Sequence, residues 1–99
     1  MAQPQGRPQA HARQMNSLLF QRGDCMEYVK SGSQFRRVLA DRTVETAEII
    51  AVHIDQQGIP HLRYRVDFIR PNRQRYVEGP RVLAARSFFD LYQERVSAA

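Results

Sequence analysis

The sequence predicts a small, mainly β domain: a partly open antiparallel barrel of about five strands with a short C-terminal helix. Three observations predict this class, namely a long alternating hairpin at 44–69, turn signals at short intervals, and a change to helical spacing near residue 87. A chain of 99 residues can build one domain with a modest core. We expect residues 1–16, which lack an apolar period, to form a flexible N-terminal tail and residues 17–99 to form a single small β-barrel domain.

The long hairpin is the clearest element. Between Pro60 and Phe68 the even positions are apolar and the odd positions are charged or histidine, so one face of this strand, including Tyr64, is expected in the core. The preceding strand is apolar at its even positions from 50 to 54. The segment 55–58, Asp-Gln-Gln-Gly, is typical of a three-residue hairpin loop closed by a left-handed glycine.

This loop also predicts the register of the hairpin. From the turn outward, the predicted pairs are Ile54/Pro60, His53/His61, Val52/Leu62, Ala51/Arg63, Ile50/Tyr64 and Ile49/Arg65. Continuing the register places Glu48 opposite Val66 on the apolar face, where an unpaired carboxylate is costly. Either a bulge precedes Ile49, or the strand leaves the core there, or Glu48 is a buried acid paired with an arginine.

Before the hairpin, the sequence predicts a first strand at 25–29, with Cys25 as a small buried residue, and a turn at 31–33. Residues 17 to 20 are apolar, and whether they join the sheet stays open. Residues 33–42 carry apolar side chains at helical spacing, which favours a loop with a helical turn; an irregular loop with one strand-like piece is the alternative.

After the hairpin, we predict a turn at 70–73, a strand at 74–77, a turn at 78–80, a strand at 81–84 and a helix from Ser87 to about Val96. Ser87 is the expected N-cap. Phe88, Leu91 and Tyr92 then share one stripe of the helix with Arg95, so the stripe would close one end of the barrel.

Composition restricts the classes of function. The net charge is +5 and fourteen of the fifteen basic residues are arginine, which favours acidic partners such as nucleic acid. A single cysteine excludes an internal disulfide framework or a cysteine-rich zinc site and fits a reducing compartment. Since neither an apolar run long enough to span a membrane nor a signal peptide is visible, we expect a cytoplasmic protein without a membrane partner.

Arginines supply the strongest functional signal, with seven of them between residues 63 and 86. Arg63 and Arg65 must share the polar face of one strand. Arg73 and Arg75 of the following segment extend that face into a stripe that would follow phosphates, and Tyr76 offers a surface for base stacking. We therefore expect a non-catalytic, monomeric domain that binds RNA or DNA; the competing interpretation is a solvated face whose arginines pair with nearby carboxylates.

Other functions have weaker support. A protein-interaction module without nucleic-acid binding is the alternative, with an exposed strand edge or the Phe35, Val38 and Leu39 segment as its docking surface. His53 and His61 face each other in the predicted register, but a third protein ligand for a metal is not evident. We expect no enzymatic activity, no cofactor and no metal, because neither a carboxylate pair nor a phosphate-binding glycine loop is present.

Over residues 20–96, the order of elements resembles the Src-homology-3-like small barrels, including Tudor and KOW modules. The resemblance begins with the Gly-Asp turn and strand at 23–29, followed by a long connection, a central hairpin, a short strand and a final helical turn. The segments 44–47 and 58–61 are similar to stretches of small bacterial proteins and imply no activity. The chain departs from KOW modules, which carry a second glycine-rich turn where only 31–33 is available, and from peptide-binding Src-homology modules, because it has no tryptophan.

Overall fold

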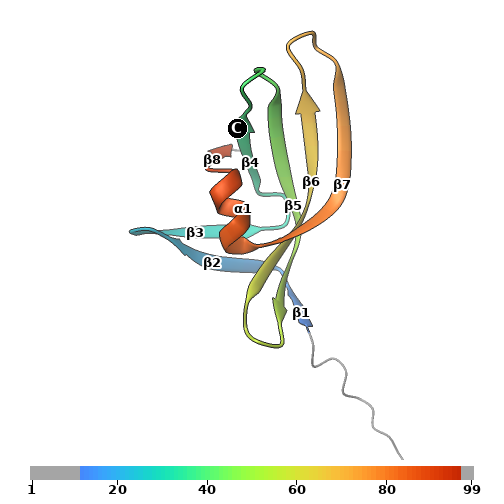
Figure 1. Cartoon of the computed structure of the whole chain (residues 1–99). Coiled ribbons are helices and arrows are strands. Elements are labelled where there is room, and N and C mark those ends of the chain that lie inside the picture. The colour runs from blue at the N-terminus through green and yellow to red at the C-terminus, as the bar shows by residue number, and fades with distance from the viewer. Residues whose placement is uncertain (1–11, 97–99) are drawn as a thin grey trace, which may run out of the picture.

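The structure of the protein, a computed structural model, describes residues 12–96. Its elements are β1 (Ala12–Met15), β2 (Ser17–Arg22), β3 (Cys25–Lys30), β4 (Gln34–Val38), β5 (Val44–Asp55), β6 (Pro60–Ile69), β7 (Arg75–Ala84), α1 (Ala85–Leu91) and β8 (Glu94–Val96). One antiparallel sheet has the order β7-β6-β5-β4-β8, with β1 also pairing with β5, and β2 pairs with β3 in a second sheet (Figure 1). The mainly β class with one short helix is confirmed, but the sheets are not closed and a barrel of about five strands is not confirmed.

The predicted N-terminal tail falls partly within a strand. Residues 1–11 of it lie outside the described residues, whereas Ala12–Met15 form β1 and pair with the turn end of β5. Residues 17 to 20 belong to β2, which pairs with β3 through the turn at 23–24. β1 is short and polar, and β2 lacks strict apolar alternation, so neither could be predicted as a strand without its partner.

The loop of the long hairpin forms as predicted. Gly58 has a φ of +83°, and its N–H donates to the carbonyl oxygen of Asp55 at 2.9 Å. The Asp55 carboxylate also accepts hydrogen bonds from the backbone N–H groups of Gln57 and Ile59, each at 2.9 Å. These contacts set the register, and the first four predicted pairs, from Ile54/Pro60 to Ala51/Arg63, are confirmed.

A β-bulge at Ile50 changes the register of the rest of the hairpin. The pairing shifts between Ile49 and Ala51, so the predicted pairs Ile50/Tyr64 and Ile49/Arg65 are wrong. Ile49 instead lies opposite Tyr64, and Glu48 lies opposite Arg65. The extra residue keeps the apolar side chains inside and moves Glu48 to the exposed face, which is the physical reason for a bulge here.

The segment 33–42 is a correction to the predicted loop with a helical turn. Gln34–Val38 form β4, which pairs with β5 on one side and β8 on the other. Phe35 is completely buried while Arg36 is exposed, so the strand-like alternative holds. The chain then turns at 39–43, where Arg42 has a φ of +70°.

β7 is one strand where two strands and a turn at 78–80 were predicted. Gly79 lies at a bulge between the two halves of β7, with a φ of +139°. A Cβ at this position would lie 2.9 Å from the Arg65 Cα. The Gly-Pro signal therefore marks a close approach to β6 and not the end of a strand.

The helix is shorter and begins earlier than predicted. It spans Ala85–Leu91, and Ala84 at its N-cap makes no side-chain cap, so the capping role of Ser87 is wrong. Arg95 lies on β8, where its guanidinium pairs with Glu27 and donates to the Tyr28 carbonyl at 2.8 Å. The helix ends at Tyr92, whose backbone is extended (φ −111°, ψ 90°), and the chain continues into β8, which pairs with β4.

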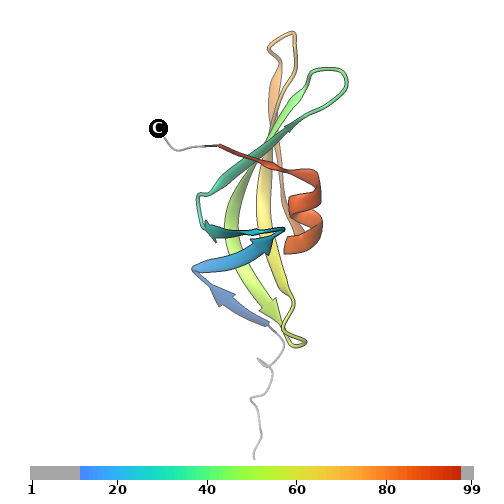
Figure 2. The ribbon, with the colours of Figure 1, turned by 90° about the vertical axis from the view of Figure 1, so that its left-hand side faces the viewer.

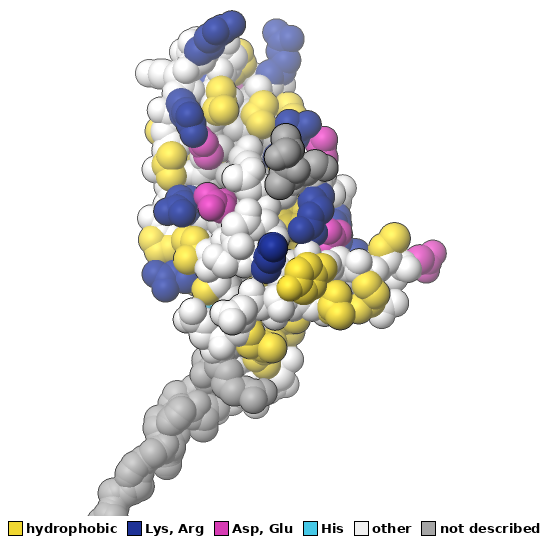
Figure 3. Space-filling view, turned by 180° about the vertical axis from the view of Figure 1, so that it is seen from behind, with side chains coloured by type: hydrophobic (Ala, Val, Ile, Leu, Met, Phe, Trp, Pro, Cys, Tyr) yellow, Lys and Arg dark blue, Asp and Glu magenta, His cyan; other side chains and the backbone are white. Residues whose placement is uncertain are grey.

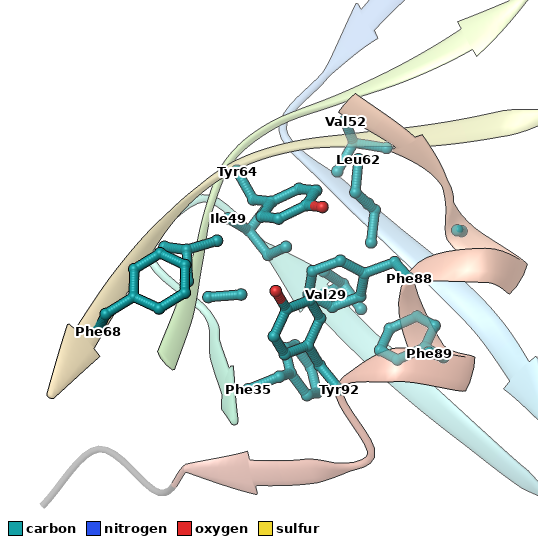
Figure 4. Packing of buried hydrophobic residues seen from close by; sticks show 13 residues of the cluster. Val29, Phe35, Ile49, Val52, Leu62, Tyr64, Phe68, Phe88, Phe89 and Tyr92 are labelled. Carbon is teal, nitrogen blue, oxygen red and sulfur yellow. The ribbon is translucent and has the colours of Figure 1, made fainter. Parts of the chain in front are cut away.

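The core lies between one face of the six-stranded sheet and a cover made of α1 and the β2–β3 hairpin (Figures 1 and 2). Phe88 lies at its centre, with ring centroids of Tyr64 and Tyr92 both 5.0 Å away and that of Phe35 at 5.7 Å (Figure 4). Tyr64 is buried, as predicted, whereas Cys25 is exposed beside the hairpin turn and not buried. The cover leaves the loop ends of β4–β5 and β6–β7 projecting beyond the core (Figure 2).

Candidate nucleic-acid interface

Arg63, Arg65 and Arg75 are exposed on the face of the six-stranded sheet that points away from the core. The Nε atom of Arg65 lies 3.8 Å from a Glu48 carboxylate oxygen. The Asp67 carboxylate binds Arg75 through Nε at 3.0 Å and Nη2 at 2.5 Å. Seen from this side, basic and acidic side chains are interspersed (Figure 3). Two of the four arginines of the predicted stripe, Arg65 and Arg75, are therefore paired with carboxylates.

The same face carries a shallow hollow of about 230 Å³, lined by Gln34, Thr46, Glu48, Arg65, Asp67, Arg75 and Val77. Two of the predicted phosphate-binding arginines thus share one hollow. The positive charges of Arg65 and Arg75 are matched there by the carboxylates of Glu48 and Asp67. The charged side chains that line this hollow therefore sum to zero and give a polyanion no net attraction.

Tyr76 lies apart from these arginines because neighbours along a strand point to opposite faces. Its ring stacks on Phe68, with centroids 4.7 Å apart and an interplanar angle of 9°. The Arg70 guanidinium lies 5.4 Å from the Tyr76 ring centroid and donates to its hydroxyl at 3.4 Å. Tyr76 keeps 38% of its surface exposed, so part of an aromatic side chain and a cation are presented together.

Arg73 lies in the loop between β6 and β7, where the predicted turn at 70–73 is confirmed. Its N–H donates to the Arg70 carbonyl at 2.8 Å, and the Asn72 side chain accepts from the Gln74 N–H at 2.9 Å. Arg73 has a φ of +70°, in the left-handed region that is uncommon for residues other than glycine. The loop thus presents Arg70 and Arg73 at one end of the molecule.

The β4–β5 loop lies beside the β6–β7 loop at this end (Figures 1 and 2). It carries Arg42, which with Arg70 and Arg73 we define as the tip cluster. All three side chains are exposed, and none has a carboxylate within ion-pair distance in the described chain. Asp41 is the nearby acid: hydrogen bonds from Thr43 lower the pKa of its carboxyl, and the charge of Arg70 lowers it further.

Ion pairing elsewhere makes the tip cluster stand out. Six of the ten acidic residues pair with arginine; they are Glu27, Glu45, Glu48, Asp67, Glu78 and Glu94. The basic residues that have no such partner within 14–96 are Lys30, Arg63, Arg86 and the tip cluster. Only the tip cluster brings three of them onto two adjacent loops, so even with Asp41 nearby the positive charge without ion-pair partners is most concentrated there.

One buried acid serves the fold and not the interface. Glu45 is 3% exposed and accepts hydrogen bonds from Arg37, through Nε at 3.1 Å and Nη2 at 3.3 Å, and from the Tyr92 hydroxyl at 2.9 Å. Burial raises the pKa of the Tyr92 hydroxyl, and its bond to Glu45 raises it further. The buried acid paired with an arginine, predicted as one option for Glu48, is therefore Glu45.

The two facing histidines were considered as a metal site. His53 lies opposite His61 as expected, and His61 Nδ1 is 3.9 Å from an Asp55 carboxylate oxygen. Residues 12–96 contain no group of three or more potential metal ligands close together.

Phe35 is buried, so the predicted docking segment at 35–39 is not exposed as a unit. None of the described helices is long and apolar enough to cross a membrane.

Comparisons of the chain with protein-family models, with curated proteins and with solved structures found no match. The resemblance to Src-homology-3-like barrels therefore stays a prediction.

Proposed function

We propose that the protein is a non-catalytic nucleic-acid-binding domain and that the tip cluster is its phosphate-binding surface. The observation that carries this proposal is the pairing pattern: on the outer sheet face Arg65 and Arg75 have carboxylate partners and only Arg63 has none, whereas all three arginines of the tip cluster lack one. Asp41 offsets part of the charge of Arg70, but a guanidinium without a salt-bridge partner loses no existing ion pair when it binds phosphate.

The aromatic pair beside Arg70 supports a single-stranded ligand. Tyr76 and Phe68 stack next to that guanidinium, and the exposed part of Tyr76 is available to an unpaired base. Base stacking on an aromatic side chain contributes about 1–3 kcal/mol and tolerates any sequence. With only three phosphate contacts, binding is expected to be weak and without strong sequence preference.

Two triple variants with the same change in net charge test the surface. The tip variant is Arg42→Gln/Arg70→Gln/Arg73→Gln, and the outer-face variant is Arg63→Gln/Arg65→Gln/Arg75→Gln. Fluorescence anisotropy of labelled single-stranded RNA and double-stranded DNA at low salt measures their affinity. We expect the tip variant to bind single-stranded RNA at least tenfold more weakly than the unmodified protein, and the outer-face variant to stay within about threefold.

Equal weakening by both variants would contradict the proposal, because it would mean that only overall charge matters. Stronger weakening by the outer-face variant would return the interface to the predicted arginine stripe. Absence of binding by the unmodified protein at low salt would remove nucleic acid as the ligand.

A further inference from the structure

The β2–β3 hairpin has two apolar faces, although only one of them packs on the core. Leu18, Phe20 and Val29 point toward the core. On the opposite face Leu19, Met26 and Tyr28, which we define as the hairpin patch, are 61%, 59% and 50% exposed. Leu19 lies directly opposite Tyr28, so the three side chains are contiguous. Figure 3 shows hydrophobic side chains gathered on this projecting hairpin.

Such a surface departs from the usual design of a half-buried antiparallel sheet, which has a polar outer face. A two-stranded sheet is also marginally stable in water when it is not covered. Contiguous exposed apolar side chains on a projecting element are a candidate surface for contact with another molecule.

We propose that a second copy of this chain covers the hairpin patch in a weak symmetric dimer. The patch itself holds no charged side chain, although the chain has a net charge of +5. The net charge opposes the approach of two copies, so the uncharged patch is where they can come together. The sequence alone predicts a monomer; the patch favours self-association instead. This inference does not depend on the proposed nucleic-acid binding.

The two ends of the hairpin carry complementary charges. Asp24 lies in the turn between β2 and β3, whereas Lys30 ends β3 on the same face as Met26 and Tyr28. Neither has an ion-pair partner among the residues that the structure describes. When two hairpins pack face to face in opposite directions about a two-fold axis, Asp24 of each copy approaches the partner's Lys30.

The size of the patch sets the expected strength. At about 200 Å² for a large side chain, the exposed fractions of Leu19, Met26 and Tyr28 amount to roughly 350 Å² in each copy. Two copies would bury roughly 700 Å² in total from these side chains, below the ~1,200 Å² of the smaller stable interfaces. The dimer should therefore be transient, with a dissociation constant from about 10 μM to 1 mM.

Sedimentation equilibrium of the full chain between about 10 μM and 1 mM tests the proposal, in reducing buffer so that the exposed Cys25 cannot crosslink. The patch variant is Leu19→Thr/Tyr28→Thr, which keeps β propensity. The control is Val77→Thr/Val82→Thr, which changes two comparably exposed residues of β7. We expect concentration-dependent dimerisation that the patch variant weakens at least tenfold and the control leaves within about twofold.

Amide NMR spectra of the unmodified protein over a dilution series test the same proposal without a variant, so they decide it even if the patch variant does not fold. The proposal predicts concentration-dependent shifts confined to residues 17–30. A monomer at 1 mM, or shifts confined to the β7 edge, would overturn it. If the patch resonances move only when single-stranded RNA is added, the occupant is nucleic acid and not a second copy.

Discussion

Replacing two glutamates of the same strand tests the bulge at Ile50 directly. The bulge places Glu45 in the interior and Glu48 on the outer face, whereas the register without it would place Glu48 inside. Glu45→Gln and Glu48→Gln are matched changes. The two positions are three residues apart on β5, and each substitution removes one negative charge and keeps nearly the same side-chain shape.

The structure sets the size of the two effects. Glu45 accepts hydrogen bonds from Arg37 and Tyr92, and an amide in its place turns one acceptor oxygen into a donor that faces them. Removing one partner of a buried ion pair costs about 3–5 kcal/mol of stability. The cost is lower here because the Arg37 side chain is 33% exposed, so water can solvate its charge when the partner is lost. We therefore expect Glu45→Gln to lower the free energy of unfolding by about 2–3 kcal/mol. Glu48→Gln should change it by less than about 0.5 kcal/mol.

Urea denaturation followed by far-UV circular dichroism measures both. With a slope of about 1–2 kcal/mol per M for a chain of this size, Glu45→Gln should move the midpoint down by about 1 M or more, and Glu48→Gln by no more than a few tenths. Equal effects of the two substitutions, or a larger effect at Glu48, would refute the placement of the bulge and the buried role of Glu45.

Three further predictions concern stability, each read out by urea denaturation. Phe88→Ala should cost about 3–5 kcal/mol because it empties the centre of the aromatic core, whereas Leu91→Ala on the exposed side of the same helix should cost under about 1 kcal/mol; similar costs would contradict this core. Gly79→Ala should cost at least about 1 kcal/mol more than Gly32→Ala, since both have positive φ but only Gly79 meets the β6 backbone; equal costs would show that contact to be absent. The stabilisation by Tyr92 should depend on pH. Because its raised pKa favours the neutral hydroxyl in the folded state, the hydroxyl stabilises the fold by about 1–2 kcal/mol below pH ~10, and this stabilisation declines above it. The stability difference from Tyr92→Phe should therefore shrink between pH 9 and 11, and a constant difference would exclude that hydroxyl as the cause.

Local patterns predicted the part of the fold that depends on neighbouring residues. The alternation of β6 and the turn chemistry of the 55–58 loop were enough to place four register pairs correctly. The position of the bulge was harder to predict. The alternating pattern of β5 shows that Glu48 would face the core without a bulge, but it does not show which residue of the strand is the extra one. A shift of one position moved Glu48 outside and left Glu45 as the buried acid.

The rest depended on contacts between distant segments. Residues 34–38 carry a spacing that suits a helix, and only pairing with both β5 and β8 makes them a strand. Because that strand was not predicted, the loop that holds Arg42 was not recognised as a hairpin tip. The arginines of the predicted stripe could be counted from the sequence, but their partners depend on register, as Glu48 for Arg65 shows.

The central claim is that the tip cluster binds phosphates, and the salt dependence of single-stranded RNA binding tests it most directly. The logarithm of the association constant is measured against the logarithm of salt concentration for the unmodified protein and for the tip and outer-face triple variants. Each phosphate contact contributes about 0.7 to the slope, so three contacts predict a slope near −2 that the tip variant loses and the outer-face variant keeps. A slope that is the same in the unmodified protein and the tip variant would contradict the account, because phosphates would then be bound elsewhere.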